Sequence, residues 1–123
     1  MMVAAEPLRL GSSRTISPRA LSVMAAYRRQ LTGNPILLRR HDAPDCYARG
    51  RVMGFSAAEI VGGVQEGRRK LIVFASDVTW SDPLREGDLA IVDGAELYVN
   101  TVDDQRRRVD GTLMAYEVTA GGR

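Results

Sequence analysis

Several residue types that build common functional sites are scarce in this chain. Its 123 residues include one cysteine, Cys46, and one histidine, His41. These counts exclude a framework of disulfide bonds, a zinc site with four cysteine or histidine ligands, and a catalytic pair of two histidines. Lysine is also nearly absent, because 16 arginines accompany only Lys70. Arginine suits planar, multi-donor interface contacts, but we attribute this bias mainly to a GC-rich coding sequence.

Long apolar runs are missing as well. No stretch approaches 18 consecutive apolar residues, so the sequence predicts no membrane-spanning helix. Residues 1–10 contain Glu6, Pro7 and Arg9, and they lack the cationic start and apolar core of a signal peptide. We therefore expect a soluble protein that is made in a reducing cytoplasm and does not bind a membrane.

The composition fits one globular domain. A chain of 123 residues has room for one hydrophobic core and not for two. Hydrophobic residues make up 45% and charged residues 26%, which is too apolar for a disordered chain. The 17 basic and 15 acidic side chains give a net charge of +2. This charge is smaller than the dense basic field of most dedicated DNA-binding domains.

One helix is predicted near the N-terminus, over residues 18–32. Ser17 is a favourable N-cap, and Pro18 suits the first helical position because its missing N–H costs nothing there. Gly33 or Asn34 can supply the left-handed residue at its end. Apolar residues recur at helical spacing and form one stripe: Ala20, Val23, Met24, Tyr27 and Leu31.

The rest of the chain is predicted to be β. The candidate strands are residues 36–39, 47–55, 70–76, 89–92, 96–102 and 107–118. The run 70–76 is apolar, which indicates a strand buried on both faces. Asp93-Gly94 suits a type I′ turn and predicts a hairpin, whereas Asp110-Gly111 is interpreted as a bulge in the last strand.

These elements predict a mainly β protein: a small antiparallel β-barrel or a compact sandwich with one N-terminal α-helix. No second helix is available for parallel crossovers, and closure would hide the strand edges. Residues 1–16 are expected to form a flexible arm, residues 17–119 a single domain, and residues 120–123 a frayed tail.

The connection between two predicted strands, from Ser56 to Arg69, is unusually long. It contains three glycines and more apolar residues than a solvent-exposed loop needs. Two interpretations remain open: a protruding loop that contacts a partner, or a helical turn that packs onto the domain before a glycine turn. Its candidate partner-binding residues are Glu59, Ile60, Val61, Gly62, Gly63, Val64, Gln65, Glu66, Arg68 and Arg69.

Motifs for a cofactor, a metal or catalysis fail on their context. Gly62 and Gly67 have the spacing of a phosphate loop, but arginines replace its lysine and its hydroxyl residue, and a strand follows. The turn 41–46 holds four metal-ligand types, yet one turn rarely suffices, and Cys46 is better explained as a small buried side chain. An enzyme would need a carboxylate pair such as Glu59 and Glu66. We expect no enzyme activity and no cofactor or metal.

Two further features have a structural and a functional interpretation. The arginines of residues 106–108 lie beside several aspartates, so we interpret them as a solvated face rather than as a phosphate contact. Trp80 precedes a turn, where it either anchors an interface or caps the core.

Four strings resemble a known family: R-G-R-V-M-G-F at 49–55, E-I-V-G-G-V-Q-E-G at 59–67, R-E-G-D-L-A-I-V-D-G at 85–94, and V-D at 102–103. They resemble the small neck proteins of tailed bacteriophages and prophages, namely the head–tail connector, head-completion or head-closure proteins. The same role exists in gene transfer agents. The resemblance covers rather more than half of the chain.

The resemblance implies a ring-forming β-barrel protein of the virion neck. Such a ring lies between the portal and adaptor on one side and the tail on the other, and it closes the DNA-filled head. By this resemblance the segment 56–69 contacts a neighbouring ring or the channel that holds packaged DNA, and residues 1–15 become ordered on assembly.

The alternative is a small OB- or SH3-like barrel that binds nucleic acid or another protein. Its nucleic-acid contacts would come from Arg49, Arg51, Arg68 and Arg69.

Overall fold

The computed structural model describes residues 9–10, 14–54 and 68–122. Within these residues lie one α-helix, α1 (Pro18–Gln30), and one short 3₁₀ helix, η1 (Ala75–Asp77). None of the described helices is long and apolar enough to cross a membrane. The described strands are β1 (Arg9–Leu10), β2 (Arg14–Thr15), β3 (Ile36–Arg39), β4 (Cys46–Ala48), β5 (Gly50–Met53), β6 (Arg69–Phe74), β7 (Leu89–Val92), β8 (Ala95–Asp103), β9 (Arg108–Val109), β10 (Thr112–Leu113) and β11 (Ala115–Gly121).

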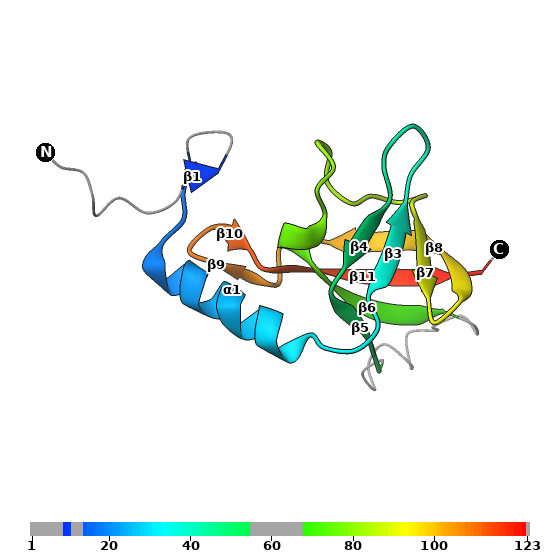
Figure 1. Cartoon of the computed structure of the whole chain (residues 1–123), viewed down its shortest axis with the longest axis horizontal. Coiled ribbons are helices and arrows are strands. Elements are labelled where there is room, and N and C mark those ends of the chain that lie inside the picture. The colour runs from blue at the N-terminus through cyan, green and yellow to red at the C-terminus, as the bar shows by residue number, and fades with distance from the viewer. Residues whose placement is uncertain (1–8, 11–13, 55–67, 123) are drawn as a thin grey trace, which may run out of the picture.

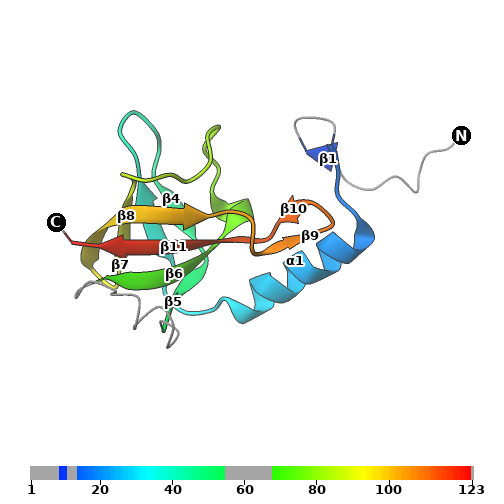
Figure 2. The same cartoon turned by 180° about the vertical axis from the view of Figure 1, so that it is seen from behind.

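Seven strands form one antiparallel sheet in the order β4-β3-β7-β8-β11-β6-β5 (Figures 1 and 2). The predicted mainly β chain with one N-terminal helix is confirmed. The sheet is not closed into a barrel, because its edge strands β4 and β5 do not pair with each other. They are nevertheless consecutive in the chain and separated only by Arg49. One segment, which bends at Arg49, therefore supplies both edge strands of a curled sheet.

The core has two parts, one on each face of the curled sheet. Alternate residues of a strand point to opposite faces, so Leu71 and Val73 of β6 enter the inner cluster while Ile72 and Phe74 enter the outer cluster. We call the face that carries Leu71 and Val73 the inner face, and the face that carries Ile72 and Phe74 the outer face. The predicted burial of β6 on both faces is confirmed, since all its residues after Arg69 are buried.

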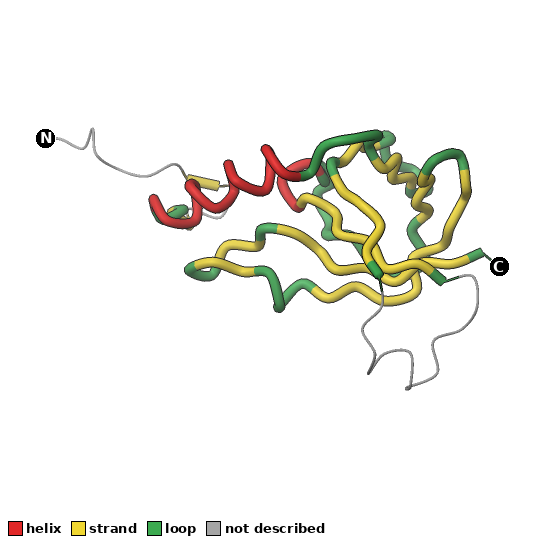
Figure 3. Tube along the Cα trace, turned by 90° about the horizontal axis from the view of Figure 1, so that it is seen from below, coloured by secondary structure: helices red, strands yellow, loops and turns green. Residues whose placement is uncertain are grey.

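Helix α1 packs on the outer cluster, beside β9, and begins as its sequence predicts. The Ser17 hydroxyl accepts a hydrogen bond from the Ala20 N–H at 3.0 Å, and proline occupies the first turn. The helix ends at Gln30, two residues earlier than predicted, and Gly33 then adopts a positive φ of 101°. Figure 3 shows α1 running beside the hairpin formed by β9 and β10.

The predicted single strand over residues 107–118 is wrong. The chain instead forms a β9–β10 hairpin and then the long strand β11. Asp110 and Gly111 both have positive φ, as in a type I′ turn, so they form the hairpin turn and not a bulge. Asp93-Gly94 has the same conformation between β7 and β8, which confirms that predicted hairpin.

The structure describes part of each predicted chain end. Ala120 and Gly121 continue β11 and are buried, so this part of the tail is not frayed. At the other end, β1 pairs with β2, and Ile16 is 3% exposed within the outer cluster. Residues 1–8 and 11–13 of the predicted flexible arm lie outside the described residues.

Gly50, at the bend between β4 and β5, provides a test of this architecture. A Cβ there would fall on the Ile72 carbonyl oxygen and 2.6 Å from Ile36 Cδ1. We expect Gly50→Ala to lower the free energy of unfolding by about 1–3 kcal/mol, because the close approach of β5 and β6 leaves no room for it. Chemical denaturation measures this change.

Gly54→Ala is the matched control, because a Cβ at Gly54 meets no atom of the described residues within 4 Å. We expect this variant to unfold like the wild type. Equal stability of the two variants would contradict the close packing of β5 on β6.

Candidate functional site

A buried carboxylate, Glu117 of β11, gathers three cations on the outer face. Its oxygens lie 2.7 Å from Arg107 Nε, 3.4 Å from Arg106 Nη1 and 3.6 Å from Lys70 Nζ. The Glu117 side chain is only 6% exposed. Arg107 also donates a hydrogen bond to the Tyr27 hydroxyl at 2.9 Å. This set, which we call the Glu117 cluster, therefore ties the sheet to α1 and to the loop before β9.

A turn at Asp103 directs the loop before β9 toward Glu117. One Asp103 carboxylate oxygen accepts the backbone N–H groups of Gln105 and Arg106 at 2.8 and 3.0 Å. These two bonds stabilise the charged carboxylate and hold the pKa of Asp103 below its usual value. The arginines of residues 106–108 are thus not simply a solvated face, because Arg107 is three-quarters buried and has two partners.

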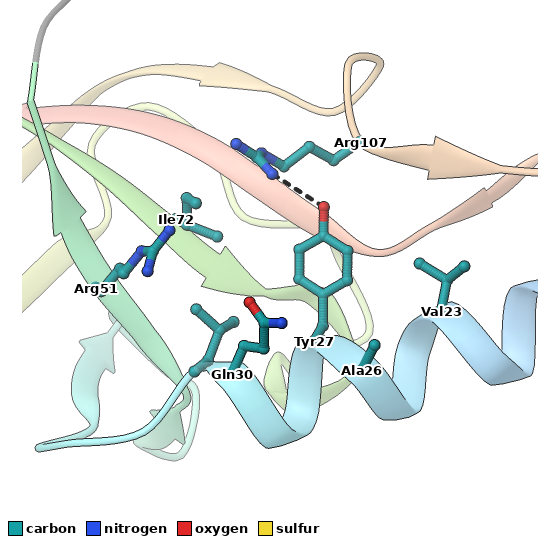
Figure 4. Close-up of a pocket in the computed structure, with 8 residues that line it drawn as sticks. Val23, Ala26, Tyr27, Gln30, Arg51, Ile72 and Arg107 are labelled. Carbon is teal, nitrogen blue, oxygen red and sulfur yellow. Dashed lines mark hydrogen bonds between the residues drawn. The ribbon is translucent and has the colours of Figure 1, made fainter.

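A cavity of about 270 Å³ lies beside the Glu117 cluster (Figure 4). Side chains of α1 form one wall, and side chains of the sheet and of the loop before β9 form the other. Its floor is largely apolar, and two arginines reach it. The lining residues are Val23, Ala26, Tyr27, Gln30, Leu31, Arg51, Ile72 and Arg107.

A second polar cluster fixes Trp80 beside the inner core. Arg40 donates two hydrogen bonds to the buried Asp88 carboxylate, at 2.8 and 2.6 Å, and these raise the pKa of Arg40 above its usual value. The Arg40 guanidinium stacks 4.3 Å from the Trp80 ring centre, and the indole N–H donates to the Pro44 carbonyl. Trp80 is half-buried against the inner cluster. These contacts favour the core-capping interpretation of this tryptophan.

Most of the predicted partner-binding residues lie outside the described part of the chain: Glu59, Ile60, Val61, Gly62, Gly63, Val64, Gln65 and Glu66. Arg68 is half-buried immediately before β6, and Arg69 is exposed at the start of β6. Trp80 lies between η1 and β7, where it stacks on Arg40 in the second polar cluster described above.

The arginines of the nucleic-acid alternative do not share one surface. Both the backbone N–H and the guanidinium of Arg49 bind the Asp77 carboxylate. Arg51 pairs with Ile72 across the β5–β6 ladder and so projects from the outer face. Arg69 stands two residues before Leu71 and therefore projects from the inner face. The described arginines form no continuous basic stripe along a strand pair, so no observation favours this alternative.

The sole cysteine is buried, as predicted. Cys46 is 3% exposed, and its sulfur lies 3.4 Å from the Thr79 hydroxyl. His41 and Asp42 are exposed on the turn before β4. No three His, Cys, Asp or Glu side chains come together as metal ligands within the described residues.

The sequence motifs did not identify the Glu117 cluster, although the sequence carries a signal for it. Lys70 stands near the start of one largely apolar strand, and Glu117 stands within another. Opposite charges in such strands indicate a buried ion pair. Comparison with known proteins adds no relative: no family model matches the chain, and no curated protein or solved structure matches it either. The function is therefore inferred from the residues of this chain alone.

We expect Glu117→Gln to lower the free energy of unfolding by about 3 kcal/mol, because it leaves buried cations without their carboxylate. Denaturant titration at low and high salt measures the loss, which should persist at high salt because the pair is buried.

The control is Asp45→Asn, which breaks the exposed Arg39–Asp45 ion pair. This variant should unfold like the wild type. A Glu117→Gln protein as stable as the wild type would show that the cluster does not hold α1 and the loop in place.

Proposed function

We propose that this chain is a non-enzymatic structural protein of a phage-like neck. It forms a ring between the portal or adaptor and the tail, closes the DNA-filled head and joins it to the tail. The four strings that resemble neck proteins support this function, and so does the mainly β fold with one N-terminal helix. The observation that carries the proposal is the length of chain inserted between β5 and β6.

The β5–β6 ladder shows that this length is not needed to connect the strands. Met53 pairs directly with Lys70, so β5 ends and β6 continues at directly opposite positions of the ladder. A two-residue turn joins such strands when connection is the only requirement. The inserted segment contains the string E-I-V-G-G-V-Q-E-G, with apolar residues and deformable glycines. A contact with another protein explains why the chain carries it.

The edges of the sheet offer further surface for ring contacts. Tyr47 on β4 is 67% exposed, and Val52 on β5 is 46% exposed. Both strands are edges of the seven-stranded sheet, where backbone groups and exposed apolar side chains invite pairing with another chain. A neighbouring copy in a ring would cover these two positions.

Deletion of the gene in the phage, prophage or gene transfer agent that encodes this chain tests the proposal. We expect heads that package DNA but neither retain it nor join tails. Electron microscopy and the amount of nuclease-protected DNA measure both defects, and the wild-type gene supplied in trans should restore them. Tailed particles at wild-type yield without the gene would overturn the proposal.

Valine at Gly62 or Gly63 tests the inserted segment itself. We expect Gly62→Val and Gly63→Val to reduce binding to the portal–adaptor complex while thermal unfolding stays close to wild type, because the segment serves an interface rather than the core. Co-sedimentation with that complex measures binding. Gly122→Val is the control, since a Cβ at Gly122 meets no atom within 4 Å in the described part of the chain. A large loss of thermal stability would instead indicate a structural turn.

A further inference from the structure

The cavity between α1 and the outer face combines an apolar floor with two guanidinium groups. Val23, Ala26 and Leu31 line it from the helix and its C-terminal end, and Ile72 lines it from β6. Figure 4 shows Arg51 and Arg107 on the sheet side, with Tyr27 and Gln30 opposite them on α1. The cavity therefore offers an aliphatic surface beside a concentrated positive charge.

The two arginines differ in whether a described carboxylate neutralises their charge. Arg107 is anchored, because it binds the Glu117 carboxylate and the Tyr27 hydroxyl. Arg51 is exposed on an edge strand and forms no ion pair with the acidic residues that the structure describes. One cation is thus held rigidly at the cavity wall, while a second stands at its mouth without a counter-ion from the described chain.

Size and chemistry together define what such a cavity takes. Pockets for whole small-molecule ligands usually measure about 300–1,000 Å³, so 270 Å³ suits one or two amino-acid side chains. A guanidinium recognises a carboxylate with two parallel hydrogen bonds, and the aliphatic floor takes up the carbon atoms beside it. The complementary group is a carboxylate with a short apolar neighbour.

We propose that this cavity is a docking site for an acidic peptide segment of a partner protein, with one Glu or Asp side chain facing Arg51 and an adjacent aliphatic side chain on the floor. Nucleic acid fits less well, because a phosphate group makes no use of the apolar floor and Arg69 projects from the opposite face. The proposal stands independently of the neck function, since it follows only from the cavity and its charges.

Titration of the full chain with N-acetyl-leucyl-glutamyl amide, followed by backbone amide NMR signals, tests the proposal. We expect the signals of Ala26, Tyr27 and Ile72 to shift on saturation. The glutaminyl peptide, which lacks the carboxylate, should bind about tenfold more weakly. Failure of the glutamyl peptide to bind, equal binding of both peptides, or equal shifts with inorganic phosphate or a DNA duplex would overturn it.

Three variants locate the site. Arg51→Gln should weaken binding of the glutamyl peptide about tenfold, because it removes a charge-assisted contact. Arg69→Gln removes the same charge from the neighbouring strand on the opposite face and should leave binding unchanged. An equal loss in both variants would show an effect of net charge and overturn the proposal. Ala26→Leu, which fills the cavity, should abolish binding while the other amide signals stay in place.

Discussion

The outer half of the molecule depends on the ion pairs that the Glu117 carboxylate forms. A carboxylate that is 6% exposed in the middle of a strand destabilises the fold unless cations neutralise it. Arg107 supplies the shortest contact, and it brings with it the loop that follows β8. Because Arg107 also binds the Tyr27 hydroxyl, the same carboxylate fixes the position of α1. The helix, the β9–β10 hairpin and the outer cluster are thus held around one charge.

The two buried acids of the described chain have different consequences for binding. Asp88 is saturated, because it accepts two hydrogen bonds from Arg40 and one from the Arg85 N–H, and Trp80 covers the guanidinium. That cluster is closed and fastens the loops beside the inner core. The Glu117 cluster gathers several cations on one carboxylate, and Arg51 adds another across the cavity. The described cations around Glu117 outnumber this one carboxylate, and this excess of positive charge beside the cavity is the basis for proposing an anionic partner there.

Local patterns predicted the elements that depend on local physics. Ser17 and Pro18 define the start of α1, and the apolar run of β6 indicates burial on both faces. The pair Asp110-Gly111 carries the same turn signal as Asp93-Gly94. The two strands beside it have only two residues each, so the sequence pattern predicted one continuous strand instead of a hairpin. The Arg107 contacts with Glu117 and Tyr27 join residues 10 and 80 positions apart, and no local pattern contains such partners.

Strand β5 links the inserted segment to the cavity. Arg51 lines the cavity, and the chain leaves the sheet for the inserted segment just after Met53, on the same edge strand. Four residue pairs with β6 and the Arg49–Asp77 contact help to hold this strand in place. A ligand that engages Arg51 would add a further restraint to β5, the strand that leads into the inserted segment. If a partner on the inserted segment also restrains β5, thermodynamic linkage requires the two binding events to strengthen each other by the same factor.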